Sequence, residues 1–240
     1  MKTNIYKSSS RGHANHGWLD SYHTFSFASY YHPERMQFGA LRVFNDDRVD
    51  PGKGFGSHPH ANMEIVSIPL SGALEHRDST GRHKIIKEGE VQIMSAGTGI
   101  VHSEYNASAE EAVSFLQIWL FPEKQDIDPR YEQKEFDLSA HEDHFMNVVA
   151  PDNSKALWIN QKAWFYLAEL SGNNTVELSI NKPVENGAFV FVIDGELEVA
   201  DHFLEKRDSL GLYHGLPEKL VFKPLKKSKV LVIELPMDVQ

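Results

Sequence analysis

Short apolar runs separated by polar turn clusters are repeated along the whole chain. The runs lie about eight to twelve residues apart, a spacing typical of sandwiches and barrels of antiparallel strands. Residues 112–121 (AVSFLQIWLF) and 188–193 (AFVFVI) are rich in β-branched and aromatic side chains, the composition of strands. Asp194-Gly195 follows the second run and is a two-residue hairpin signal. The pattern predicts an all-β protein with few short helices.

A weak internal repeat indicates two similar halves. Ile65–Glu75 and Ala188–Glu198 each contain an apolar strand, a turn ending in glycine, and a strand with the sequence X-Leu-Glu. Chance similarity between two hairpins is the alternative. The charged segment Glu132–His144 follows two prolines and is interpreted as the connection. We therefore predict one unit over residues 1–130 and a second over residues 131–240.

Composition restricts the function without defining it. The 240 residues carry a formal net charge of −10, which argues against a general nucleic-acid binder with a basic face. No cysteine is present, so disulfides, thiolate metal sites and cysteine nucleophiles are excluded. No apolar stretch approaches the roughly 20 residues of a membrane helix, and the first residues lack a signal-peptide core. We expect a cytoplasmic protein that binds neither membrane nor nucleic acid directly.

Two short motifs carry the most specific chemistry. His58-Pro-His60 and His102-Ser-Glu104 each place two ligand-type side chains at positions i and i+2. On a strand such residues point to the same face, so each pair can direct two ligands at one point. Three imidazoles and one carboxylate suit a first-row divalent ion with coordination positions left open for substrate. The alternative is four surface or capped polar residues with no ion.

The second half does not share these motifs. At the offset of the internal repeat, His58 and His60 fall on Asn181 and Pro183, and nothing matches His102-Ser-Glu104. If the halves are duplicated, only the first has kept the metal.

The flanking residues resemble the pirin family. The segment from Gly52 to Gly72 resembles the first cupin motif, and that from Gly97 to Asn106 the second. The match extends over nearly all of the first 135 residues, in the stretches RGHANHGWLD (11–20), HTFSF (23–27), LRVFNDD (41–47), GFGSHPH (54–60) and MSAGTGIVHSE (94–104). In the second half only the overall pattern of a shortened cupin is similar.

The resemblance implies a bicupin, two antiparallel jelly-roll-like β-barrels, with the metal in the N-terminal one. It implies iron(II) as the usual metal and His58, His60, His102 and Glu104 as its ligands. Zinc, nickel, copper or manganese could take the same donors in a purified sample. Glu64 is then left outside the ligand set, as a candidate partner of a ligand imidazole or a pocket residue.

The resemblance also implies a reaction. Bacterial pirin-like proteins are similar to quercetin 2,3-dioxygenases, which open the heterocyclic ring of a flavonol with O₂ and release carbon monoxide. Glu104 is the candidate catalytic base for the substrate hydroxyl. Gln117 lies on strand 112–121 and is predicted to face the substrate pocket, although the outer face is nearly as good an interpretation. The partners expected are a small flavonol-like aromatic substrate and O₂.

Two other functions remain open. The first is a non-catalytic, metal-binding pirin-type regulator that acts through a protein partner. The second is a sugar-phosphate isomerase, which needs basic residues near the metal, where Arg42 and Lys53 are the only candidates. His13, His16 and Asp20 could form a second metal site, and His141 with His144 has the spacing of a metal pair; we interpret the first group as a structural loop and the second as a solvated face.

Overall fold

The computed structural model describes residues 1–238 and is built almost entirely of strands, as predicted. In the first half these are β2 (Gly12–Asn15), β3 (Leu19–His23), β4 (Leu41–Val49), β5 (Gly54–His60), β6 (Glu64–Ser71), β7 (Ala73–Asp78), β8 (His83–Lys87), β9 (Glu90–Ser95), β10 (Ile100–Asn106), β11 (Val113–Leu120) and β12 (Arg130–Glu135). The others are β1 (Lys2–Tyr6), β13 (Met146–Ala150), β14 (Leu157–Trp158), β15 (Trp164–Leu170), β16 (Val176–Ser179), β17 (Asn186–Asp194), β18 (Glu196–Val199), β19 (His202–Glu205), β20 (Ser209–Tyr213), β21 (Lys219–Pro224) and β22 (Ser228–Pro236). The helices assigned in residues 1–238 are single 3₁₀ turns, η1 (Ser8–Ser10) and η2 (Ser139–His141), and none could span a membrane.

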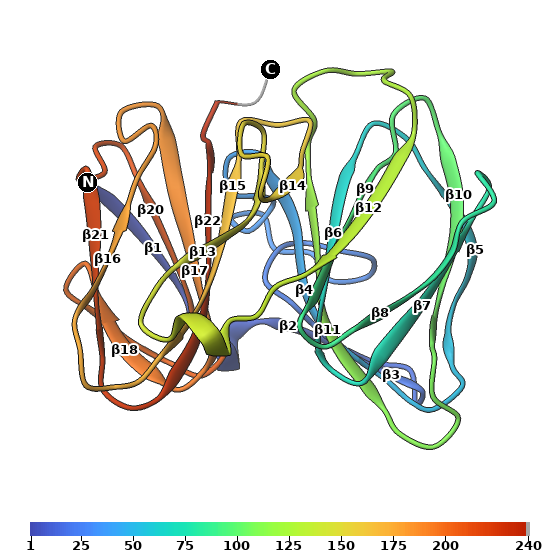
Figure 1. Cartoon of the computed structure of the whole chain (residues 1–240), viewed down its shortest axis with the longest axis horizontal. Helices are drawn as coiled ribbons and strands as arrows, with labels where there is room; N and C mark the ends of the chain where they lie inside the picture. The colour runs from blue at the N-terminus through green and yellow to red at the C-terminus, as the bar shows by residue number, and fades with distance from the viewer. Residues whose placement is uncertain (239–240) are drawn as a thin grey trace.

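The strands form two lobes of the same design (Figure 1). Each lobe pairs a seven-stranded sheet with a four-stranded sheet. In the first lobe the orders are β12-β9-β6-β11-β4-β3-β2 and β5-β10-β7-β8. In the second they are β1-β20-β17-β22-β15-β13-β14 and β16-β21-β18-β19. The bicupin prediction is confirmed, with the difference that each lobe is a two-sheet sandwich rather than a closed barrel.

Two strands complicate the division of the chain at residue 130. β1 lies at the start of the sequence but pairs with β20 in the second lobe, where Figure 1 shows it among the orange and red strands. β12 lies after residue 129 but pairs with β9 in the first lobe. The predicted boundary therefore stays a prediction, and each lobe includes a strand contributed from the other side of it.

The largest apolar core lies between the two seven-stranded sheets. Phe189 of β17 packs against Phe44 of β4, with ring centroids 5.1 Å apart, and against Tyr6, Phe25 and Phe38. Odd-numbered residues of β17 face this core, whereas Ala188, Val190 and Val192 face a second core inside the second lobe. Both faces of β17 are buried, which explains why its sequence is continuously apolar rather than alternating.

The interior of the first lobe is different. Its apolar residues form two smaller clusters, one around Phe115 and Leu74 and the other around Ile65 and Met94. Buried polar residues, among them His76, His102 and Glu104, occupy the same interior. Because buried polar groups are costly unless they are paired, this lobe is where a functional site is expected.

Candidate metal centre

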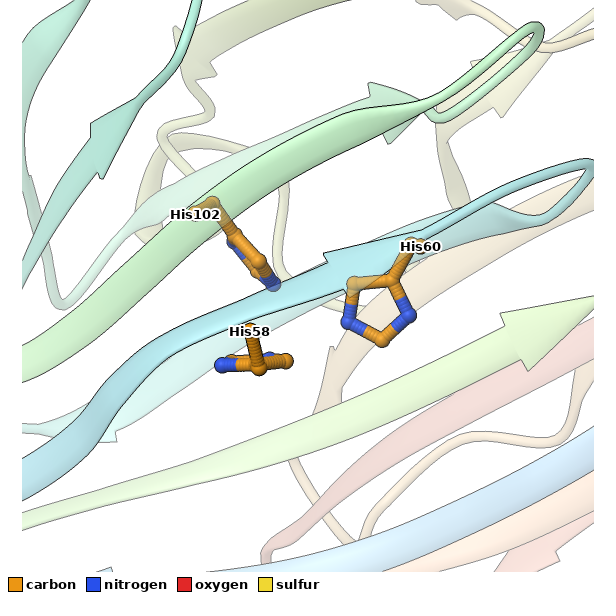
Figure 2. A group of neighbouring side chains, drawn as sticks. All are labelled: His58, His60 and His102. Atoms are coloured by element: carbon orange, nitrogen blue, oxygen red, sulfur yellow. The ribbon is translucent and has the colours of Figure 1, made fainter.

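Three histidines converge from two neighbouring strands. β5 and β10 pair antiparallel, with His102 opposite His58 and Ile100 opposite His60. The ring centroids of His58, His60 and His102 lie 4.5 to 4.9 Å apart, and one nitrogen of each lies within 4.8 Å of the others. Figure 2 shows the three rings gathered on one side of the two strands. The spacing of i and i+2 therefore brings both histidines of β5 to the same face, beside the histidine of β10.

These imidazoles are suited to hold a metal ion. Burial lowers the pKa of His60 to about 4 and that of His102 to about 2, so both rings are neutral and keep a free lone pair. Nε2 of His102 is buried and has no hydrogen-bond partner among the described residues. Nδ1 of His58 donates to the carbonyl of Gly56 at 2.7 Å, which leaves its Nε2 free. A divalent cation would satisfy nitrogens that the protein leaves unpaired.

Glu104 lies beside this cluster but has its own partners. It is 2% exposed, and one carboxylate oxygen lies within 4.8 Å of ligand atoms of His102 and His76 rather than of all three clustered histidines. Gln117 Nε2 donates to Glu104 at 2.7 Å, and Ser67 Oγ lies 3.4 Å away. Burial raises the pKa of Glu104 to about 7, against the hydrogen bond from Gln117. Its place as the fourth ligand stays a prediction.

A cavity of about 290 Å³ opens beside the cluster. His58, Glu104 and Gln117 form part of its wall. A second part of the wall is aromatic and apolar, with lining residues Leu19, Phe27, Phe55 and Trp119. Ligand pockets are typically concave, mostly apolar, and equipped with a few polar groups, and this cavity has that composition.

The cavity also has a polar wall. Ser21 Oγ donates to Asp47 and lies 2.8 Å from His23 Nε2. Burial raises the pKa of Asp47 to about 7, although the hydrogen bond from Ser21 opposes the shift. These three residues, together with Asn45, line the cavity and give it a second carboxyl group besides Glu104.

The other residues singled out from the sequence lie as follows. Glu64 is buried and accepts from Ser95 Oγ at 2.8 Å and from the backbone N–H of Asn160 at 3.1 Å, so its partners are not the clustered imidazoles. Arg42 donates to two backbone carbonyls, and Lys53 is exposed. Neither lines the cavity beside the cluster.

The two additional histidine groups have no shared ligand geometry within residues 1–238. His13 pairs with Asp20 at 2.6 Å on the surface, and His16 lies at the edge of the cavity. His141 and His144 are both exposed near η2. Sequence reasoning missed His76, a fully buried histidine of β7 that contacts His102. The signal was present in the alternation of Leu74, His76 and Asp78 along that strand.

The chain is similar to known proteins over most of its length. The Pirin family model matches residues 5–120, and the model of the quercetinase C-terminal cupin domain matches residues 147–235. A quercetin 2,3-dioxygenase of Escherichia coli K12 is 42% identical over 233 residues, covering 97% of this chain and 98% of the relative. A pirin-like protein of Caulobacter vibrioides is 38% identical over 84% of this chain and 86% of its own length.

Solved structures give the same result. The crystal structure of YhhW from Escherichia coli has a TM-score of 0.93 at 40% identity and covers 100% of both chains. Bacterial pirin YhhW in complex with nickel(II) has a TM-score of 0.91 at 40% identity, covering 98% of this chain and 99% of its own. The fold and the histidine cluster define a two-lobed cupin with a metal-type site. Within that class, the chain belongs to the pirin family.

Proposed function

We propose that this protein is a metal-dependent quercetin 2,3-dioxygenase-like oxidoreductase that uses O₂ to open the ring of a flavonol-like substrate and releases carbon monoxide. The proposal is supported by relatives of that name at about two-fifths sequence identity over almost the whole chain. The observation that carries it is that one cavity is lined by both a clustered histidine, His58, and the buried carboxyl group of Glu104. A substrate in this cavity would meet a metal site and a proton acceptor together.

His58, His60, His102 and Glu104 are proposed to hold the ion, with iron(II) as the metal of the active protein. When bound, iron(II) would supply a Lewis acid for the substrate hydroxyl and the redox chemistry that O₂ requires. The structure of bacterial pirin YhhW in complex with nickel(II), at 40% sequence identity, supports the binding of a divalent metal ion. Metal analysis with an anomalous signal at this position would identify the ion.

The residues of the chain are proposed to position the substrate and move its proton. The carboxylate of Glu104 accepts the proton of the flavonol 3-hydroxyl, and Gln117 holds that carboxylate by donating to it at 2.7 Å. The ring of Trp119 lies edge-on to His60, with centroids 4.8 Å apart, and offers an aromatic surface beside the cluster. The apolar part of the wall lowers the local dielectric constant, which strengthens the hydrogen bonds beside it.

The test is oxygen uptake and carbon monoxide release by iron-loaded protein with quercetin. Wild-type protein should consume O₂ and release carbon monoxide in equal amounts. Glu104→Gln should lose turnover by about 10²–10⁴-fold, the usual contribution of a positioned base, while its iron content is measured independently. Glu75→Gln makes the same chemical change on β7 at a side chain that forms a surface ion pair, and it should leave turnover unchanged.

Two results would contradict the proposal. Undiminished turnover in iron-containing Glu104→Gln would remove the role of that carboxylate. Fully loaded wild-type protein that consumes no O₂ with quercetin would exclude the dioxygenase and leave the metal-binding regulator.

A further inference from the structure

A chain of hydrogen bonds leads from the histidine cluster into the first lobe. Nδ1 of His102 lies 3.5 Å from Nδ1 of His76, and Nε2 of His76 lies 3.0 Å from Oδ2 of Asp78. The side chains of His76 and Asp78 are completely inaccessible to solvent. We infer that Asp78 and His76 are positioning residues that fix the proton of His102 on Nδ1 and so direct the lone pair of its Nε2 toward the metal.

The strand register creates this chain. β7 and β10 are antiparallel neighbours, with Asp78 opposite His102 and His76 opposite Glu104. Side chains two residues apart on a strand share a face, so all four point into the same interior. The ring of Tyr131 packs on the ring of His76 at 4.6 Å and 33°, which restrains its plane.

Asp78 is the first residue of the hydrogen-bond chain, because its Oδ1 already accepts three hydrogen bonds and only Oδ2 faces His76. Oδ1 of Asp78 accepts from the backbone N–H of Thr80 at 2.8 Å, from the Thr80 hydroxyl at 2.5 Å and from the backbone N–H of Arg82 at 3.3 Å. These donors favour an ionised carboxylate and fix its orientation, since each of them requires an acceptor. Oδ2 is therefore presented to His76 as an acceptor.

The protons then follow in order. A carboxylate only accepts, so Nε2 of His76 carries a hydrogen and donates it to Asp78. In a neutral ring Nδ1 of His76 is then an acceptor, and the hydrogen between the two histidines belongs to Nδ1 of His102. Nε2 of His102 is left with a lone pair, and it is the buried nitrogen that has no partner among the described residues. Ligand histidines are commonly oriented by a carboxylate in this way, here with a second imidazole between the two.

Another arrangement uses the same residues. His76, His102 and Glu104 each offer a ligand atom within 4.8 Å of the others, so a second ion between them would make His76 a ligand instead of a positioning residue. The hydrogen bonds of His76 to Asp78 and of Glu104 to Gln117 favour the positioning role, because they already satisfy these groups. The number of ions bound per chain separates the two arrangements.

Asp78→Asn gives the sharpest test. The three donors of the turn hold the amide oxygen, so the amide nitrogen faces His76 and donates to its Nε2. Every proton of the chain is then reversed, and Nε2 of His102 carries a hydrogen that opposes metal binding. His76→Phe removes the chain while keeping an aromatic ring against Tyr131. Glu75→Gln is the matched control, since Glu75 pairs with His83 on the outer face of the same hairpin at 2.6 Å.

Two measurements decide the inference, and both depend on the proposed metal site but not on the proposed reaction. Two-bond ¹H–¹⁵N NMR spectra of metal-free protein report the tautomer of His102. We expect the Nδ1–H form in the wild type and in Glu75→Gln, and the Nε2–H form in Asp78→Asn. Competition with a chelator for nickel(II) should show binding weakened by about 10–100-fold in Asp78→Asn and His76→Phe and unchanged in Glu75→Gln.

Any one of three results would overturn the inference that Asp78 and His76 position His102. These are an Nε2–H tautomer of His102 in the wild type, nickel(II) binding by His76→Phe as tight as that of the wild type, or two nickel ions per chain. Should Asp78→Asn fail to fold, the wild-type tautomer and His76→Phe still decide. Neither measurement uses quercetin. A negative result for the tautomer or for nickel(II) binding therefore does not affect the oxygen-uptake assay, and a negative oxygen-uptake assay does not affect these two measurements.

Discussion

The buried carboxyl group of Glu64 makes the stability of the protein depend on pH in a calculable way. Glu64 is 1% exposed, at the start of β6. Its Oε2 accepts from Ser95 and from the backbone of Asn160, so it joins the first lobe to a loop of the second, while Oε1 is buried with no hydrogen-bond partner in residues 1–238. Burial raises its pKa from 4.5 to about 7, although both hydrogen bonds oppose the shift.

The direction of the pH dependence follows from the number of protons that the folded and the unfolded states bind. Between the unfolded pKa of 4.5 and the folded value of about 7, the folded protein holds a proton on Glu64 that the unfolded chain has released. The free energy of unfolding therefore falls as the pH rises through this window, and is independent of Glu64 below and above it. A shift from 4.5 to about 7 corresponds to about 3 kcal/mol, at about 1.4 kcal/mol for each pKa unit.

Glu64→Gln is the perturbation that isolates this effect. The glutamine keeps an oxygen for Ser95 and Asn160 but cannot ionise. The stability advantage of the wild type over the variant should therefore shrink by about 2–3 kcal/mol from about pH 5 to about pH 8. Asp47 and Glu104 have raised pKa values too, and their effects cancel in the difference because both proteins retain them.

The assay is urea unfolding of metal-free protein at several pH values, followed by circular dichroism and by tryptophan fluorescence. Coincidence of the two transitions checks that a two-lobed chain unfolds in one step. Glu110→Gln, at an exposed loop position, is the control, because it removes a carboxyl group without changing a buried contact. A wild-type advantage over Glu64→Gln that is constant from pH 5 to 8, or that grows with pH, would refute the burial argument.

Two further substitutions test the architecture that supports the site. Phe189→Ala opens a cavity between the seven-stranded sheets, so it should lower the free energy of unfolding by about 3–5 kcal/mol in urea unfolding. A loss under about 1 kcal/mol would contradict the shared core. Gly97 has φ of +48°, and a Cβ added there would overlap the carbonyl oxygen of Ile127. Gly97→Ala should therefore destabilise the protein, and it should weaken nickel(II) binding because it displaces the start of β10. Gly89→Ala also has positive φ but meets open space, so it should cost only the backbone strain of about 1–3 kcal/mol and leave nickel(II) binding unchanged.

Local patterns were sufficient for the fold class and for placing His58 and His60 on one face of a strand. Alternation and turn residues are properties of short segments, and they predicted an all-β chain that the structure confirms. The face shared by His58 and His60 follows from strand geometry alone. The pairing of β5 with β10 joins segments that are far apart in the sequence. It was predicted from the resemblance to cupins rather than from the residues themselves.

The remainder depends on pairings that no local pattern contains. No pattern within Lys2–Tyr6 indicates its partner, yet β1 pairs with β20, about 200 residues away, at the edge of the seven-stranded sheet. His76 and Asp78 read as the end of a hairpin strand, and their role appears only when the register of β7 against β10 is known. The same holds for the polar cavity wall of Ser21 and Asp47, which β3 and β4 bring together.

The second lobe contains a buried carboxyl group with a structural role. Glu234 of β22 is fully buried and accepts four N–H groups at 2.8 to 2.9 Å, from the backbone and side chain of Asn181, the backbone of Lys182 and the side chain of Asn186. Asn181 is the residue that the internal repeat aligns with a histidine of the first lobe. Each carboxylate oxygen of Glu234 accepts two of these N–H groups, so the protein itself supplies the partners of this buried group. His102 has the opposite arrangement, with one nitrogen held by the protein and the other buried and unpaired. Because an unpaired buried nitrogen costs about 1–3 kcal/mol and a paired one does not, the first lobe has the arrangement expected for a ligand and the second that of a scaffold.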